Sequence, residues 1–244
     1  MSIAERLPGE VSVHDDPVTV AQAVAAWVQA VSMACVRRTR RFTIALAGGD
    51  IAAQVHHALA EEPWRSEIEW DAWHVYFGDE RAVSPDDESS NYHMACETLL
   101  DHVPVNPELV HRMPADAPDL DAAAAEYARL LAAQLPAGAL GAPRLDCILL
   151  GIGENGHTAS LFPGTDAADV ADAWATRGRA DYKPYDRMTL TLPCINAAAA
   201  VAFCVTGSSK REALQHVIDG TAVAARVRPR DGALRWFLDS AAAR

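Results

Sequence analysis

The sequence lacks the short motifs that mark several large enzyme classes. It contains no G-x-S-x-G nucleophile elbow, no H-E-x-x-H motif and no cysteine–histidine cluster with zinc spacing. A covalent serine mechanism and zinc-dependent hydrolysis are therefore not indicated. Hydrolysis by this chain would have to use water activated by a side chain.

Cysteine is scarce and is not arranged in pairs. The five cysteines form an odd set without a C-x-x-C motif, and several lie inside apolar runs such as LDCILL and AFCV. We therefore predict reduced thiols in the core, which fits a cytosolic compartment. The five are Cys35, Cys96, Cys147, Cys194 and Cys204.

Positive charge and long apolar runs are also limited. The formal net charge is -12, which disfavours binding to nucleic acid or to an anionic membrane. The first residues lack the apolar run of a signal peptide, and we find no stretch with the roughly 20 apolar residues of a membrane helix. We expect a soluble cytoplasmic protein, a monomer or weak homo-oligomer, with residues 1–244 in a single domain.

Strands and helices alternate along the chain. Asp16 and Pro17 predict a helix start, and this helix extends to about Arg38. Three strand, turn and helix units begin with the runs at 41–47, 72–78 and 145–151. Further strands are expected at 188–193 and 200–207, and helices at 90–100, 120–134 and 208–219.

Apolar runs such as CILLGI and AFCV predict strands that are buried on both faces. The sequence therefore predicts an α/β fold, a three-layer α/β/α domain with a mainly parallel, Rossmann-like sheet. Ligands of such sheets bind beyond the carboxyl ends of the strands. We expect the loops after residues 47, 77, 150 and 206 to form one crevice.

The strongest candidate site is GIGENGHTASLFPG, residues 151–164. Its dense glycines indicate positive φ angles or a close approach between backbone and ligand. We expect His157 and Thr158 at a helix N-terminus, where free N–H groups favour an anion. Gly151, Gly153 and Gly156 match the spacing of a dinucleotide fingerprint, but the motif follows a later strand and no long crossover helix is indicated. A tight turn with an incidental surface histidine is the alternative.

Two further motifs follow predicted strands. GDERAV, residues 78–83, places Asp79, Glu80 and Arg81 side by side, and TGSSK, residues 206–210, brings Lys210 to the start of a helix. Such a lysine is well placed to hold phosphate. A solvated charged loop and an exposed helical lysine are the structural alternatives.

In order and spacing, these motifs resemble the 6-phosphogluconolactonase family across about residues 40–240. The resemblance rests on GDERAV, SSNYHM, LLGIGENGHTASLFPG, RMTLTLP, VTGSSKREAL and RVRPRDGALRWFLD. The related glucosamine-6-phosphate deaminases have a central motif similar to GHIAFNEP. This chain reads GHTASLFP, which favours the lactonase.

The resemblance implies hydrolysis of 6-phospho-D-glucono-1,5-lactone, the second step of the pentose phosphate pathway, without metal or organic cofactor. His157 would activate water, Asp79 would orient His157 or the sugar, and the glycine loop would stabilise the oxyanion. The residues expected to bind the sugar phosphate are Gly48, Gly49, Arg81, Gly153, Asn155, Gly156, Arg187 and Lys210.

The chain departs from the family pattern at two positions. Asn155 stands where the family usually has an aspartate, which removes a charge and can keep a hydrogen bond. The first glycine loop reads GGDIA where the family commonly reads GGSTP. We expect Asp50 of this loop to cap the following helix and to oppose a phosphate bound there.

Two other functions remain open from the sequence. One is an amino-sugar-phosphate deaminase or isomerase. The other is a sugar-phosphate sensor without catalysis, although no DNA-binding helix pair precedes the domain.

Overall fold

The computed structural model describes residues 2–244 and has an α/β architecture with two sheets. The main sheet has the strand order β1-β9-β8-β5-β2-β3, and every neighbouring pair is parallel. Its strands are β1 (Glu10–His14), β2 (Phe42–Leu46), β3 (Trp73–Phe77), β5 (Cys147–Leu150), β8 (Ala200–Val205) and β9 (Ala233–Asp239). The predicted parallel sheet is confirmed.

A small antiparallel sheet lies apart from the main one, in the order β4-β7-β6. Its strands are β4 (Asp79–Arg81), β6 (Ala175–Arg179) and β7 (Asp186–Leu190). The strand expected at 188–193 is thus present as β7, but it belongs to this second sheet.

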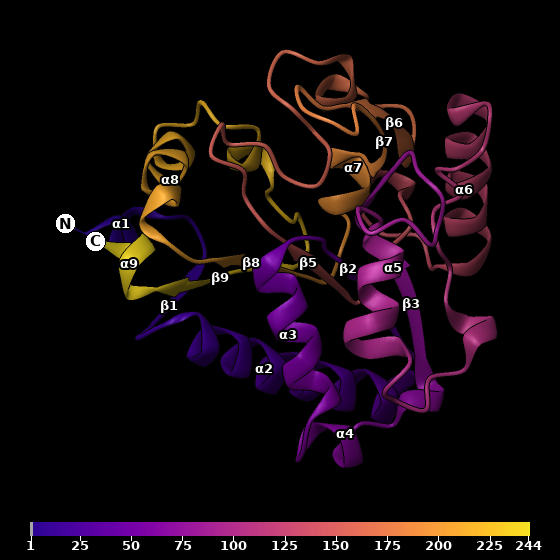
Figure 1. Cartoon of the computed structure of the whole chain (residues 1–244), viewed down its shortest axis with the longest axis horizontal. Coiled ribbons are helices and arrows are strands. Elements are labelled where there is room, and N and C mark those ends of the chain that lie inside the picture. Colours follow the sequence, from indigo (N-terminus) through magenta and orange to yellow (C-terminus); the bar gives the residue numbers. More distant parts are fainter. Residues whose placement is uncertain (1) are drawn as a thin grey trace.

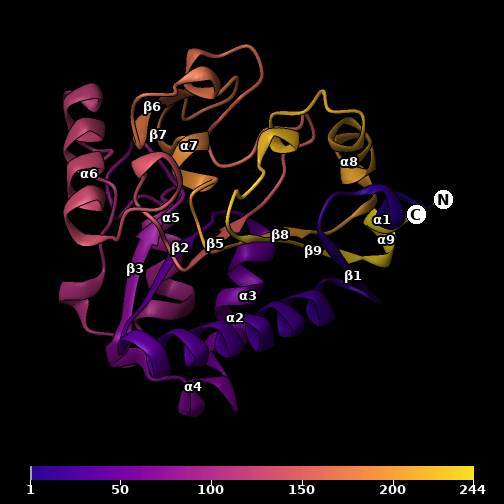
Figure 2. The ribbon, with the colours of Figure 1, turned by 180° about the vertical axis from the view of Figure 1, so that it is seen from behind.

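Helices cover both faces of the main sheet, with α2 and α3 on one face and α7, α8 and the small sheet on the other (Figure 1). The reverse view shows the same layers, with the two chain ends close together beside α1 and α9 (Figure 2). The α-helices are α1 (Ile3–Arg6), α2 (Pro17–Thr39), α3 (Asp50–Ala60), α4 (Trp64–Glu67), α5 (Asn91–Ala95), α6 (Leu120–Gln134), α7 (Leu192–Ile195), α8 (Arg211–Ile218) and α9 (Ser240–Ala243).

Helix α2 begins as the sequence predicts. The Asp16 carboxylate accepts a hydrogen bond from the Thr19 N–H at 2.8 Å, and Pro17 occupies the first turn. By length and composition α2 could cross a membrane, so the expectation that no stretch is long and apolar enough was wrong. One side of α2, including Val20, Val24 and Val28, is buried against the main sheet and α3. This is the packing of a core helix.

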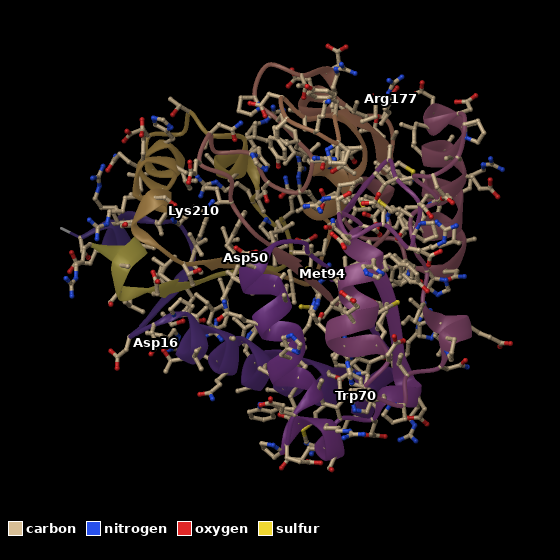
Figure 3. The ribbon with its side chains drawn as sticks, viewed as in Figure 1. Asp16, Asp50, Trp70, Met94, Arg177 and Lys210 are labelled. Atoms are coloured by element: carbon tan, nitrogen blue, oxygen red, sulfur yellow. The ribbon has the colours of Figure 1, made fainter. Side chains whose placement is uncertain are left out.

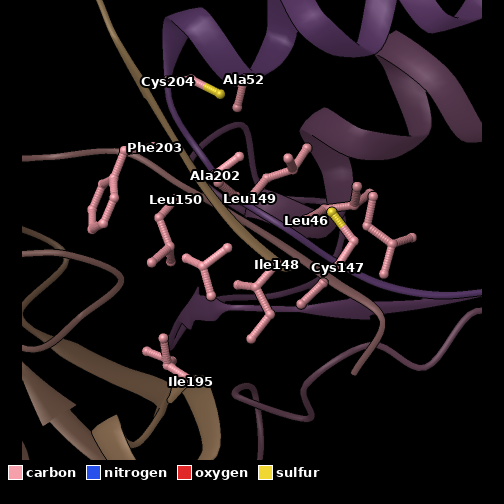
Figure 4. Packing of buried hydrophobic residues seen from close by; sticks show 14 of the residues in the cluster. Leu46, Ala52, Cys147, Ile148, Leu149, Leu150, Ile195, Ala202, Phe203 and Cys204 are labelled. Carbon is pink, nitrogen blue, oxygen red and sulfur yellow. The ribbon is translucent and has the colours of Figure 1, made fainter. Parts of the chain in front are cut away.

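The centre of the core is formed by β2, β5 and β8, whose side chains are buried on both faces. Figure 4 shows Cys204 beside Ala52 of α3 on one face and Ile195 of α7 on the other. All five cysteines are free, and four of them are buried as predicted, whereas Cys96 is only half-buried. The apolar strand runs therefore fix the central strands between two helical layers and bring their carboxyl ends to one edge.

Candidate active site

A cavity of about 210 Å³ lies at the carboxyl ends of β2, β3 and β5. Strand order changes direction between β2 and β5, and ligands of open α/β sheets bind at such a switch point. The predicted convergence of the four loops is confirmed. Residues expected from the sequence that line the cavity are Gly48, Gly49, Asp79, Arg81, Gly153, His157, Arg187 and Lys210.

The glycine-rich loop after β5 is a series of turns and not the start of a helix. The expectation that His157 and Thr158 lie at a helix N-terminus was therefore wrong. Gly156 has a φ of 80° and Ala159 a φ of 47°, and such left-handed residues interrupt a helix. The Gly153 N–H donates to the His157 carbonyl at 2.9 Å and closes the turn.

Glycine at position 153 is required by the histidine itself. A Cβ atom on Gly153 would lie 2.0 Å from Nδ1 and Cε1 of His157. The imidazole therefore rests directly on the backbone of the loop. The contact with His157 therefore explains why the motif has glycine at position 153.

His157 is held on two sides. Its Nδ1 lies 2.6 Å from Oδ1 of Asn155, and its ring stacks on Phe162 with a centroid distance of 4.1 Å. Because Oδ1 of an amide accepts only, Nδ1 carries the proton and Nε2 is left as the basic nitrogen. Burial lowers the pKa of His157, while Asp79 opposes this shift. The imidazole is therefore neutral at neutral pH.

Asn155 and Gly156 do not line the cavity. Asn155 orients the His157 ring through its hydrogen bond, and Gly156 shapes the loop through its left-handed backbone conformation. A Cβ on Gly156 would also come within 2.8 Å of the Ala222 Cβ. Their contribution is thus to the loop rather than to direct contact with a ligand in this cavity.

Asp79 is fixed by two neighbouring side chains. Ser160 Oγ donates to its Oδ2 at 2.5 Å, and Asn91 Nδ2 contacts its Oδ1 at 3.2 Å and its carbonyl at 2.9 Å. Within residues 2–244 the Asp79 carboxylate makes no hydrogen bond to His157. Asn155, and not Asp79, therefore orients the imidazole.

Glu80, the neighbour of Asp79, has a structural role. Its buried carboxylate accepts the backbone N–H groups of Arg81, Asn91 and Tyr92 at 2.8, 2.7 and 2.8 Å. Burial raises the pKa of Glu80, and these hydrogen bonds oppose that shift. This residue ties β4 to the beginning of α5.

Three cations and one carboxylate line the cavity. Arg187 is 1% exposed, and within residues 2–244 its Nη1 has no hydrogen-bond partner. Burial and the nearby Arg81 lower the pKa of Arg187. Arg81 donates to the Ser89 carbonyl, and Lys210 ends a short 3-10 helix (Ser208–Lys210) that leads into α8. With Asp79 as the lining carboxylate, the cavity is locally positive in an acidic protein.

The structure corrects the expectation for Asp50. Gly49, with a φ of 94°, is the N-cap of α3, and Asp50 is the first helical residue without a side-chain cap hydrogen bond. Asp50 is exposed at the beginning of α3, and Figure 3 labels it and Lys210. The helix is capped by glycine geometry and not by the carboxylate.

Three residues of the site were not singled out from the sequence. Asn91, Ser160 and Tyr182 line the cavity beside the expected residues. Asn91 and Ser160 stand in the SSNYHM and GHTASLFPG motifs, so their signal was position within a motif. Tyr182 lies in the loop between β6 and β7, where the sequence carries no comparable signal.

Within residues 2–244, no group of three or more His, Cys, Asp or Glu side chains could hold a metal ion. The fold and the cavity define an α/β protein with a neutral histidine in a small cavity that is lined by three cationic side chains. The chain belongs to the family of glucosamine-6-phosphate isomerases/6-phosphogluconolactonase, whose model matches residues 15–236.

Relatives of known name agree with this assignment. The chain is 40% identical over 211 residues to 6-phosphogluconolactonase of Nostoc sp., covering 85% of each chain. It is 34% identical over 249 residues to probable 6-phosphogluconolactonase 1 of Arabidopsis thaliana, covering 96% of this chain and 92% of the relative. The structure of 6-phosphogluconolactonase from Trypanosoma brucei matches with a TM-score of 0.85 and 30% identity, over 96% of this chain and 97% of the other.

Proposed function

We propose that this protein hydrolyses 6-phospho-D-glucono-1,5-lactone to 6-phosphogluconate, the second step of the pentose phosphate pathway. The observation that carries the proposal is the Asn155–His157 hydrogen bond of 2.6 Å beside the three cavity cations. A neutral, oriented imidazole supplies a base, and the cations supply a site for a phosphorylated substrate. The relatives named 6-phosphogluconolactonase support the same reaction.

In the proposed mechanism, Nε2 of His157 takes a proton from water while the water oxygen attacks C1 of the lactone. The tetrahedral intermediate then collapses and the bond between C1 and the ring oxygen breaks. The imidazolium returns its proton to that oxygen, which leaves as the C5 hydroxyl. Backbone N–H groups of the glycine loop would stabilise the oxyanion.

Arg81, Arg187 and Lys210 would hold the phosphate and sugar oxygens. Arg187 supports this role most directly, because a buried guanidinium without a partner for Nη1 is costly until an anion arrives. Asp79, fixed by Ser160 and Asn91, would accept hydrogen bonds from sugar hydroxyls. Gly48 and Gly49 would let the substrate approach the backbone after β2.

Acid release from freshly generated 6-phosphogluconolactone, measured against the uncatalysed rate, tests the proposal. Hydrolysis well above that rate supports the lactonase, whereas binding without acceleration would indicate a sensor. Ammonia release from glucosamine 6-phosphate would instead indicate a deaminase. Each of the three functions gives a different combination of results in the acid-release, binding and ammonia measurements.

The remaining expectations concern the setting of the reaction. The five free cysteines fit a reducing cytoplasm. The net charge of -12 disfavours nucleic acid and anionic membranes as partners. We expect a monomer or weak homo-oligomer, which analytical ultracentrifugation would test.

A further inference from the structure

The loop between β6 and β7 carries two tyrosines in similar surroundings. Tyr182 is 49% exposed and Tyr185 is 41% exposed. Each ring lies 5.5 Å from the guanidinium carbon of an arginine, Arg187 for Tyr182 and Arg179 for Tyr185. They differ in position: Tyr182 lines the cavity beside the buried Arg187, whereas Tyr185 lies outside the cavity beside the exposed Arg179.

Tyr182 lies between Arg187 and the ring that covers His157. The Tyr182 ring meets the Phe162 ring edge-on with a centroid distance of 5.9 Å, and Phe162 stacks on His157 with a centroid distance of 4.1 Å. On its other side lies the Arg187 guanidinium. The rings of Tyr182 and Phe162 thus form a continuous wall from the proposed base to the proposed phosphate ligand.

We infer that Tyr182 is a positioning residue for the lactone hydrolysis, whose ring closes the outer wall of the cavity and shields Arg187 and the Phe162-covered face of His157 from bulk solvent. This inference rests on the proposed function. Arg187 is 1% exposed although it lines an open cavity and its neighbour Tyr182 is at the surface. An ion pair between Arg187 and a phosphate is stronger when water is excluded.

The same wall affects His157. Burial is the main cause of the lowered pKa of His157, and Phe162 is the ring that covers it. The charged groups that face His157 are Asp79 from β4, Lys210 from the 3-10 helix, Asp181 from the β6–β7 loop and Arg187 from β7. Removing the Tyr182 ring leaves all four charges in place, so a change in the pKa of His157 would report the loss of shielding.

Three variants separate positioning from a structural role: Tyr182→Ala, Tyr182→Phe and the matched control Tyr185→Ala. We expect Tyr182→Ala to raise KM for the phosphorylated lactone about 3- to 30-fold. This range corresponds to the free energy of a cation–π contact, from a solvent-exposed site to a desolvated one. The acidic limb of its kcat/KM profile should move to higher pH, because bulk water would solvate the imidazolium of His157 better and so raise its pKa. Tyr182→Phe should restore the pH profile and most of the loss in KM, because it keeps the ring and removes only the interaction of the Tyr182 hydroxyl with Arg187.

Tyr185→Ala should match the wild type in KM and pH profile, and melting curves should show all variants folded. If Tyr182→Ala behaves as Tyr185→Ala does, or lowers KM, the inference is wrong. Titration of the product, 6-phosphogluconate, into each variant separates this failure from failure of the proposed function. If the wild type binds the product without hydrolysing the lactone, the proposed function is wrong. In that case, weaker product binding by Tyr182→Ala than by Tyr185→Ala would still support the proposed role of the Tyr182 ring.

Discussion

Oδ1 of Asn155 lies 2.6 Å from Nδ1 of His157 and accepts a hydrogen bond from its N–H. The bond fixes the tautomer with a free Nε2 and adds no negative charge next to the ring. An aspartate at this position would give the same geometry but would also stabilise the protonated imidazole. The residue at position 155 therefore sets the charge next to the proposed base, although it does not line the cavity.

Asn155→Asp should raise the pKa of His157, because an opposite charge within hydrogen-bond distance favours the imidazolium. The base works only when neutral, so the acidic limb of kcat/KM should move up by about one pH unit or more. Activity at pH 6 should fall relative to activity at pH 8. Asn155→Ala, which removes the bond without adding charge, should lower kcat without this shift. An unchanged acidic limb in Asn155→Asp would mean that His157 is not the titrating base.

His157→Gln should lower kcat by about 10²–10⁴, the range for loss of a positioned general base. The wild-type acidic limb should lie below the ordinary histidine pKa of about 6.5, since burial lowers the pKa of His157. His57→Gln, on the exposed side of α3, is the control and should keep full activity. Near-normal turnover in a folded His157→Gln variant would remove this residue from the mechanism.

Lys210→Ala and Arg187→Ala should raise KM for the phosphorylated lactone and change hydrolysis of unphosphorylated gluconolactone much less. Because Arg187 is fully buried, Arg187→Met is a second variant that keeps most of its volume. Arg226, which pairs with Asp169 at 2.8 Å outside this cavity, provides the control Arg226→Ala. Equal losses on both substrates would show that the two cations are structural.

Much of the main sheet could be predicted because its signals are local. The Asp16 cap and the apolar run CILL each specify an element within a few residues. The edge strand β1 and its neighbour β9 were not predicted, since β1 is half polar and its pairing of Glu10 with Arg235 joins opposite ends of the chain. Short β4 is likewise charged throughout and is a strand only through its pairing with β7.

The site residues likewise could be predicted only where the sequence carries a local signal. Residues in strand-terminal motifs, such as Asp79 and Lys210, were found because parallel strands bring such loops together. Tyr182 was not found because an antiparallel hairpin carries it over the cavity, and the sequence does not reveal that arrangement. The helix expected at His157 failed on backbone geometry, as the φ angles of Gly156 and Ala159 show.

Acid should destabilise the protein through His56. This side chain is fully buried, its Nδ1 lies 3.0 Å from Thr98 Oγ1, and burial lowers its pKa to about 4. Between pH 6.5 and 4 the unfolded chain binds a proton that the folded state does not, so the free energy of unfolding falls as pH falls. The contribution approaches about 3 kcal/mol at pH 4.

Urea unfolding at pH 7 and pH 4.5 measures this effect. His56→Gln, which cannot titrate, should lose less stability between the two pH values than the wild type. The exposed His102→Gln should lose as much as the wild type. If His56→Gln is as acid-sensitive as His102→Gln, the buried imidazole is not a source of acid lability.

Asp50 remains the residue that fits a phosphate-binding loop least well. Its carboxylate caps nothing, yet it stands next to Gly49, which lines the cavity. A phosphate at the beginning of α3 would meet this negative charge, so affinity for the phosphate should rest mainly on Arg187 and Lys210.

Asp50→Ser and Asp50→Asn both remove the charge. We expect KM for the phosphorylated lactone to fall about two- to fivefold, the effect of a surface charge at a helix end. KM for unphosphorylated gluconolactone should not change. The melting temperature should drop by only about 1–4 °C, because a favourable charge at the helix N-terminus is lost but no cap hydrogen bond is. Kinetics on both lactones with a melting curve measure all three quantities. An unchanged or raised KM in the folded variants would show that Asp50 does not oppose the phosphate and that the anion binds away from α3.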